Sequence, residues 1–237
     1  MSVDFAAVVP VFNPEPGLPE LCRALADSFP LVVVVDDGSV EDVEAFASLP
    51  PGVTLLRHAV NAGKGRAMKT AFAWLSRERP DLAGAVFADG DGQHRVEDVR
   101  AVAEKAQVQN RVVFGVRDFG AHGVPFRSWW GNRWTALEVR LLFGYRLADT
   151  QTGLRAVPRR LFPALAALPG ERFEYEAAWF RGLRARGEPI LEQPIATVYL
   201  RNNRASHFRP WRDTLLTQRA LWRPFWYTTR HETDEKN

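Results

Sequence analysis

The stretch AGAVFADGDGQH, residues 83–94, joins an apolar run to a cluster of polar side chains. Residues 83–88 are small or apolar, which is typical of a buried strand. In an extended segment, side chains two residues apart point the same way, so Asp89, Asp91 and Gln93 are predicted to form one row. The alternative is an ordinary polar turn after a core strand, because Asp and Gly are common turn residues.

The row of Asp89, Asp91 and Gln93 predicts a divalent cation site. Carboxylate and amide oxygens are hard ligands that suit Mg²⁺ or Mn²⁺. In proteins, Mg²⁺ usually completes its coordination shell with water and substrate phosphates. The pattern therefore points to a phosphorylated ligand beside the metal.

Strand-like and helix-like segments alternate on both sides of this stretch. The predicted strands are residues 5–11, 31–35, 53–56, 83–88 and 111–116, and the helices between them are residues 20–26, 40–48, 67–77 and 96–106. Such alternation with short connections indicates a doubly wound sheet with right-handed crossovers. The fold class is therefore predicted as α/β, with a mostly parallel central sheet flanked by helices.

The second half of the chain has a different pattern. Helices are predicted at residues 127–143, 158–167 and 172–186, a polar turn at 149–155, a strand at 190–200, and a broken helical stretch at 207–227. No repeat or linker is visible, so we expect one domain. Residues 1–208 would form its body, and residues 209–237 an amphipathic Trp- and Arg-rich segment with a tail.

Polar residues follow the predicted strands directly, where ligands bind in open α/β sheets. These positions are Asn13, residues 36–39, residues 61–66, residues 89–94 and Arg117. Their shared position at one edge of the sheet, with acids beside basic groups, predicts a site for a phosphorylated ligand.

Several of these residues allow two interpretations. Asp36 or Asp37 could bind a nucleoside, or cap the following helix; we expect at least one to be structural. Lys64 could stand beside an anion at a helix N-terminus or lie in solvent. Asp149 could act as a base toward a hydroxyl acceptor or serve as a turn residue.

The composition limits where this protein is expected to act. The 237 residues are 46% hydrophobic and 25% charged, which is enough to bury a core. The single cysteine, Cys22, fits a reducing compartment and helix packing. We see no signal peptide and no apolar stretch of the ~18 residues that cross a bilayer, so we expect a cytoplasmic protein.

Tryptophan and arginine gather in two segments of the second half. The tryptophans are Trp129, Trp130, Trp134, Trp211, Trp222 and Trp226. Tryptophan with arginine favours the lipid headgroup region, which predicts a peripheral membrane surface near the acceptor. The alternative is that the rings pack as core. Nucleic-acid binding is disfavoured by the acidic metal site, although such residues also stack on bases.

These motifs together resemble family 2 glycosyltransferases of the GT-A fold, in particular the polyprenyl-phosphate sugar synthases that include dolichyl-phosphate mannose synthase. The matching segments are residues 8–13, 35–39, 61–65, 89–94 and 149–155, then Arg201 followed by Ser206 and His207. The resemblance runs over residues 5–207. It departs where Pro14 replaces the usual glutamate, where His207 replaces a lysine, and where Val116 replaces the serine often found before the arginine.

The resemblance implies transfer of a hexose, with inversion, from a GDP- or UDP-sugar to a dolichyl or undecaprenyl phosphate. Asp89, Asp91 and Gln93 would bind the metal, and Arg117 would meet the acceptor phosphate. The donor-binding residues would be Pro10, Phe12, Asn13, Asp36, Asp37, Lys64, Asp89, Arg201 and His207. The catalytic residues would be Asp91, Arg117, Asp149 and Arg201.

The sequence leaves other functions open. A GT-A enzyme with a saccharide, protein or small-metabolite acceptor would need a base such as Asp149. A non-enzymatic, membrane-surface module that binds nucleotide sugars is disfavoured by the metal-binding pattern, and a nucleotidyltransferase is a weaker option. The sequence does not decide whether an integral membrane partner anchors the chain.

Overall fold

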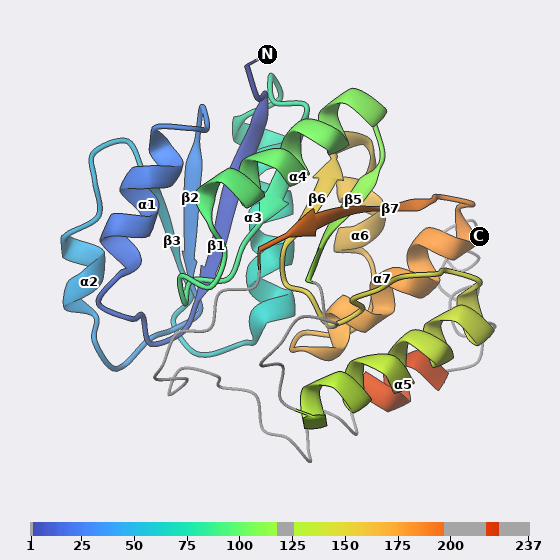
Figure 1. The fold of residues 1–237 in the computed structure, drawn as a ribbon. Helices are drawn as coiled ribbons and strands as arrows, with labels where there is room; N and C mark the ends of the chain where they lie inside the picture. Colours follow the sequence, from blue (N-terminus) through green and yellow to red (C-terminus); the bar gives the residue numbers. More distant parts are fainter. Residues whose placement is uncertain (1, 118–125, 197–216, 223–237) are drawn as a thin grey trace, which may run out of the picture.

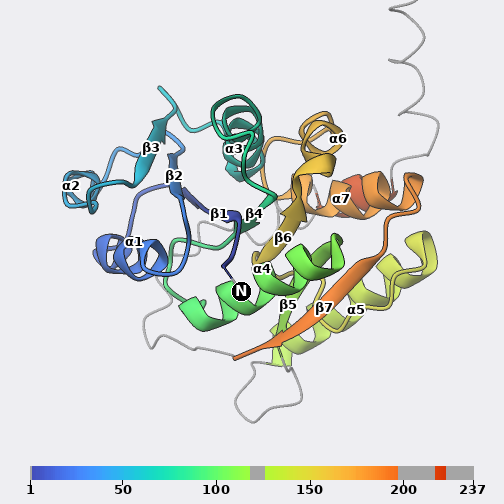
Figure 2. The ribbon, with the colours of Figure 1, turned by 90° about the horizontal axis from the view of Figure 1, so that it is seen from above.

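The structure, a computed structural model, describes residues 2–117, 126–196 and 217–222. Seven strands form one sheet in the order β3-β2-β1-β4-β6-β5-β7 (Figures 1 and 2). They are β1 (Phe5–Val11), β2 (Val32–Asp36), β3 (Thr54–Arg57), β4 (Gly84–Phe87), β5 (Val112–Arg117), β6 (Arg155–Pro158) and β7 (Ile190–Ile195). Only β6 runs antiparallel to its neighbours, so the prediction of a mostly parallel sheet is confirmed.

Helices cover both faces of the sheet, as Figure 2 shows from above. One face carries α1 (Leu18–Ala26), α2 (Glu44–Ala47) and α4 (Val96–Gln109). The other carries α3 (Lys64–Glu78), α5 (Phe126–Phe143), α6 (Phe162–Ala166) and α7 (Glu174–Ala185). Each layer has its own core because alternate strand residues point to opposite faces: Val33 and Val35 pack on one side, Val32 and Val34 on the other.

An aromatic cluster fills the core beneath α3 and α7. Trp179, which is fully buried, has its ring centroid 6.2 Å from that of Phe72, 6.3 Å from Phe87 and 6.4 Å from Phe114. The last two rings come from β4 and β5, so this cluster fixes α7 over the strands whose ends carry Asp89 and Arg117.

The strand β6 was not predicted. Arg155 was predicted to end a polar turn and Pro158 to start a helix, with the two residues between them unassigned; the helical part begins instead with a 3₁₀ turn at Arg159–Leu161. Four residues headed by an arginine carry little strand signal. They form a strand because β4 and β5 supply hydrogen-bonding partners on both sides, which is a tertiary effect.

Other boundaries differ from the predictions by a few residues. The helix expected at residues 40–48 is only the short α2, and β7 ends at Ile195, with residues 197–200 outside the described part. Residues 217–222 are helical, as expected within the stretch 207–227. In the described ranges, no helix is both long and apolar enough to cross a membrane.

The parallel strands β1, β2, β4 and β5 end at one edge of the sheet, the lower edge in Figure 1. Asn13, Asp36, Asp89 and Arg117 follow or end these strands. The fold therefore places the predicted polar clusters along a common edge.

Candidate functional site

Asp89 lies just beyond β4 and is held from three sides. Oδ1 of Asp89 accepts a hydrogen bond from Nζ of Lys64 at 2.7 Å. Its Oδ2 lies 3.5 Å from Nε2 of His94, a buried ring whose nitrogens have no hydrogen-bond partner among the described residues. Gly153 packs so closely that a Cβ there would overlap the Asp89 carboxylate. The side chain of Asp89 remains 34% exposed, so this fixed carboxylate is open to a ligand.

Lys64 lies inside the protein rather than in solvent. Its side chain is 16% exposed, which rules out the alternative of a free surface lysine. Besides Asp89, its Nζ donates to Oε1 of Glu176 on α7 at 3.2 Å. Glu176 in turn lies 3.9 Å from Nε of Arg155, a fully buried residue of β6. Four charges of alternating sign thus run from the strand edge into the core.

The charges of this network set the ionisation of Asp89 and Lys64. Burial alone would raise the pKa of Asp89, but the positive charge of Lys64 and the contact with His94 hold it well below its usual range. Burial would likewise lower the pKa of Lys64, but the charges of Asp89 and Glu176 raise it above its usual value. Both groups are therefore ionised at neutral pH.

Asp91 is brought beside Asp89 by a turn, not by an extended segment. The strand ends at Phe87, residues 90–91 form a turn, and Gly92 adopts a φ of +70°. Alternation of side chains along a strand was thus the wrong reason for pairing the two carboxylates. They do interact: burial, and next the charge of Asp89, raise the pKa of Asp91. Backbone N–H of Gln93 donates to Oδ1 of Asp91 at 3.0 Å.

This pair of carboxylates suits a divalent cation. No group of three or more acidic, histidine or cysteine residues that could hold a metal exists in the described ranges. One or two carboxylates are sufficient for a cation that also takes water and phosphate oxygens. Burial raises the pKa of Asp91 most, and the negative charge of Asp89 raises it further; a bound cation would offset this second contribution.

Asp37, expected to contact a nucleoside, is bonded within the chain. Its Oδ1 accepts from the backbone N–H of Ala62 at 3.0 Å, and Oδ2 from that of Gly63 at 2.7 Å. Nδ1 of His58 lies 2.8 Å from Oδ1. Asp37 therefore fixes the loop that leads into α3 and so positions Lys64. This confirms that at least one acid of the pair is structural.

The other expected nucleoside residues lie at the ends of β1 and β2 and around the loop that follows β2. Oδ1 of Asp36 accepts from the N–H of Ser39 at 2.8 Å, and its Oδ2 lies 3.5 Å from Nε of Arg57. Oδ1 of Asn13 accepts from the N–H of Val40 at 3.0 Å, so both side chains also support the loop after β2. Pro10 lies in β1 opposite Val35, and Phe12 follows that strand half-buried.

Asp149 is fully buried and orients Arg117. Nε of Arg117 donates to Oδ2 of Asp149 at 2.7 Å, and the N–H of Gln151 donates to Oδ1 at 3.0 Å. With both oxygens bonded and no exposed surface, Asp149 is badly placed to act as a base toward an acceptor. It holds the guanidinium of Arg117 at the end of β5 instead.

Buried Asn132 of α5 fixes the segment around Asp149. Its Nδ2 donates to the carbonyl of Ala148 at 2.6 Å, and its Oδ1 accepts from the N–H of Thr150 at 3.0 Å. Helix α5 is thereby connected to the residues that orient Arg117.

The sequence did not indicate Glu176 or His58 as parts of this site. Glu176 joins the site through tertiary packing, and the positions of His58 and Asp37 in the sequence match no motif. Gly153 and Arg155 both lie in the matching segment 149–155, but neither was predicted to have a role, although a glycine beside a polar turn can mark close backbone approach.

Part of the predicted site cannot be placed. Arg201, His207, Trp211 and Trp226 lie outside the described residues, as does the side chain of Trp129. The described Trp130, Trp134 and Trp222 are 51%, 57% and 61% exposed. They are therefore not core residues, whereas Trp179 is fully buried.

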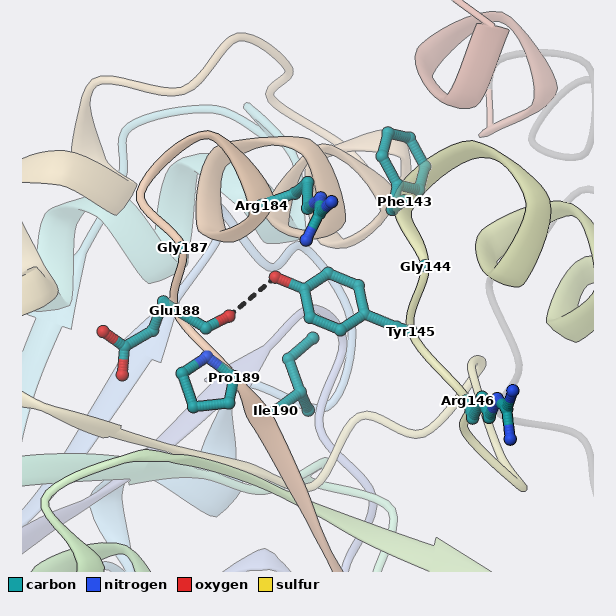
Figure 3. A pocket seen from close by; sticks show the side chains of 9 residues that line it. All are labelled: Phe143, Gly144, Tyr145, Arg146, Arg184, Gly187, Glu188, Pro189 and Ile190. Carbon is teal, nitrogen blue, oxygen red and sulfur yellow. Dashed lines mark hydrogen bonds between the residues drawn. The ribbon is translucent and has the colours of Figure 1, made fainter.

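A cavity of ≈ 350 Å³ lies at the opposite edge of the sheet, where β7 begins (Figure 3). Tyr145 and Arg184 line it, and the Tyr145 hydroxyl donates to the carbonyl of Glu188 at 2.7 Å. The Glu188 carboxylate is bonded to Arg160 at 2.6 Å. None of the predicted site residues lines this cavity, so it is separate from the site at Asp89.

Replacing Asp91 by Asn tests the electrostatics of the carboxylate pair. Because the folded-state pKa of Asp91 is raised, the folded chain binds its proton more tightly than the unfolded chain, and ionisation lowers the free energy of unfolding. Asp91→Asn should therefore raise Tm at pH 7 in metal-free buffer. The gain should shrink as the pH falls toward about 4 and vanish at about pH 3, where the carboxyl is protonated in both states.

Calorimetry across this pH range measures the effect, with Asp81→Asn as a control. Asp81 is bonded to Arg79 at 2.7 Å and its pKa is lowered by that bond, so its replacement should not raise Tm. An Asp91→Asn variant with an unchanged or lower Tm at pH 7 would contradict the raised pKa of Asp91.

Comparison with known proteins agrees with this geometry. The family model described as glycosyl transferase family 2 matches residues 6–163, which is more than half of the chain. An undecaprenyl-phosphate 4-deoxy-4-formamido-L-arabinose transferase of Pseudomonas paraeruginosa is 30% identical over 172 residues, covering 68% of this chain and 49% of the relative.

Two further proteins resemble most of the chain. A UDP-N-acetylglucosamine–dolichyl-phosphate N-acetylglucosaminyltransferase of Methanococcus voltae is 24% identical over 216 residues, covering 81% of this chain and 84% of the relative. Glucosyl-3-phosphoglycerate synthase of Mycobacterium tuberculosis, solved with Mn²⁺, UDP and glucosyl-3-phosphoglycerate, has a TM-score of 0.66 at 18% identity, covering 92% of this chain and 77% of its own. The chain belongs to glycosyl transferase family 2 and has the GT-A fold.

Proposed function

We propose that this chain transfers a hexose, with inversion, from a nucleotide sugar to a polyprenyl phosphate at a membrane surface. The observation that carries the proposal is the ionised, partly exposed Asp89, held by buried Lys64 beside Asp91. Two relatives whose names specify undecaprenyl and dolichyl phosphate support the acceptor class.

Asp89 and Asp91, with Gln93, would hold Mg²⁺ or Mn²⁺ against the donor diphosphate. The presence of Mn²⁺ and UDP in the solved neighbour supports a metal and a nucleotide donor. When bound there, the cation would supply positive charge that stabilises the leaving diphosphate. Pro10, Phe12 and Asp36 would line the nucleoside pocket around the loop that Asp37 fixes.

Arg117 would bind the acceptor phosphate in the orientation that Asp149 gives it. An oxygen of this phosphate attacks the anomeric carbon as the bond from that carbon to the diphosphate breaks, so inversion results. A phosphate is already an anion at neutral pH and needs no strong base. Because Asp149 is buried and both its oxygens accept hydrogen bonds, a phosphate acceptor is favoured over a hydroxyl acceptor that needs a base. The chain then acts by positioning the reactants.

A small phosphorylated acceptor is the second candidate. The solved neighbour whose alignment covers 92% of this chain is a glucosyl-3-phosphoglycerate synthase, and its structure contains glucosyl-3-phosphoglycerate. Arg117 could bind that phosphate too, but the reacting oxygen would then be a hydroxyl, which calls for a base.

An acceptor panel tests the function directly. Purified chain, Mn²⁺ and each of several GDP- and UDP-hexoses are incubated with undecaprenyl phosphate, dolichyl phosphate or 3-phosphoglycerate, and glycosylated products are identified by mass spectrometry. We expect a lipid-linked hexose phosphate from one donor, reduced about 100-fold or more by Asp91→Ala. Product from 3-phosphoglycerate alone would favour the second candidate, and full activity of Asp91→Ala would refute the metal assignment.

The outer face of α5 supports location at a membrane surface. Its apolar residues at helical spacing are Trp130, Trp134, Leu137 and Leu141, which are 46–74% exposed. Trp222 adds a further exposed ring, with its Nε1 donating to Glu138 of α5 at 3.2 Å. A stripe of tryptophan and leucine on a surface helix fits the headgroup region of a bilayer.

Changing this stripe should weaken membrane binding. We expect Trp130→Ser with Trp134→Ser to reduce flotation with anionic liposomes, because two large rings no longer enter the headgroup region. Val108→Ser is the matched control, since Val108 is 61% exposed on α4 on the other face of the sheet. Equal flotation of the double variant and the unaltered chain would remove the membrane claim.

A further inference from the structure

The ammonium of Lys64 lies between two carboxylates of unequal exposure. Nζ is 2.7 Å from Oδ1 of Asp89 and 3.2 Å from Oε1 of Glu176. Lys64 and Glu176 are 16% and 13% exposed, whereas Asp89 is 34% exposed. Lys64 thus approaches Asp89 from the protein interior, and a ligand from solvent would approach the same carboxylate from outside.

Lys64 and a divalent cation at Asp89 compete for one carboxylate. The two positive charges also repel each other across a site that is partly removed from water. A cation at Asp89 is therefore favoured only if the ammonium has a second anion within reach. Glu176 is that anion, because it already accepts a hydrogen bond from Nζ.

Glu176 is anchored more firmly than Lys64. It belongs to α7, and its Oε1 lies 3.9 Å from Nε of Arg155. Arg155 is itself fixed by bonds to the carbonyls of Thr152 at 2.9 Å and Glu176 at 2.8 Å, with its guanidinium 4.4 Å from the ring centre of Phe114. The flexible four-carbon stem of Lys64 is the part of this network that can shift.

We propose that Glu176 is a positioning residue that takes over the ammonium of Lys64 when a divalent cation binds Asp89. The inference rests on the proposed function in one respect, since it takes Asp89 as a metal ligand. Without the charge of Glu176, Lys64 would stay on Asp89 and oppose the cation. No bond forms or breaks in this exchange of ion-pair partners.

A matched ion pair on the same two parts of the fold provides the control. Nζ of Lys69, also on α3, lies 3.2 Å from Oε1 of Glu171, shortly before α7. The Glu171 carboxylate also pairs with Arg66 at 2.6 Å. Glu171→Gln therefore removes the carboxylate partner of another mostly buried lysine on α3, at a more exposed residue that pairs with Arg66 and Lys69 and not with Asp89.

The experiment measures Mn²⁺ binding alone, by electron paramagnetic resonance of free Mn²⁺, at pH 7.5 without nucleotide. Glu176→Gln should weaken binding about 5- to 20-fold, which lies within the range of coupling energies between residues in contact. Lys64→Met should strengthen binding, because the competing ammonium is gone. Adding Glu176→Gln to Lys64→Met should cause no further weakening, and Glu171→Gln should bind Mn²⁺ as the unaltered chain does.

Each other outcome overturns a distinct claim. Normal Mn²⁺ binding by a folded Glu176→Gln variant overturns the role of Glu176. The role is also overturned if Glu176→Gln weakens binding as much in the Lys64→Met variant as in the unaltered chain, because the charge of Glu176 would then act on the cation directly. If Glu176→Gln does not fold, Lys64→Met provides the test, because it leaves Arg155 and Glu176 in place. Unchanged or weaker Mn²⁺ binding by Lys64→Met overturns the proposed exchange of ion-pair partners. Absence of Mn²⁺ binding by the unaltered chain overturns the metal assignment, and this inference with it.

Discussion

The ion pair between Lys64 and Asp89 is the interaction on which the rest of the site depends. A carboxylate two thirds removed from water is stable as an anion only with a close positive charge. Lys64 supplies that charge, but a buried ammonium needs anions of its own, and Glu176 is the second. Arg155 continues the alternation into the core. Residues of α3, α7 and β6 therefore set the charge of one side chain beyond β4.

Backbone anchors hold this arrangement in place. Asp37 fixes the loop before α3 through the N–H groups of Ala62 and Gly63, and this fixes the backbone position of Lys64. Asp149 and Asn132 do the same for Arg117 from the other half of the chain. Most acids at this edge thus position cations or loops. Asp91 differs, because burial and the nearby charge of Asp89 both raise its pKa, and the chain offsets these effects only partly.

The sequence predicted the sheet and its polar edge because apolar runs and strand-end polar residues are local patterns. It did not predict β6, whose four residues form a strand only between β4 and β5. The role of Glu176 was not predicted either, because its position in the sequence does not differ from that of an ordinary acidic residue on a helix. Asp89 and Asp91 do interact electrostatically, but a turn around Gly92 connects them, and not the extended segment that the sequence pattern predicted.

The central claim is that Asp89 and Asp91 together hold a divalent cation against a diphosphate. Anomalous diffraction at the manganese edge, from crystals grown with Mn²⁺ and a nucleoside diphosphate, measures this directly. The account predicts one peak within bonding distance of an oxygen of each carboxylate and of the diphosphate. A diphosphate bound at the strand ends with no peak between these carboxylates, and with Lys64 still on Asp89, would contradict it.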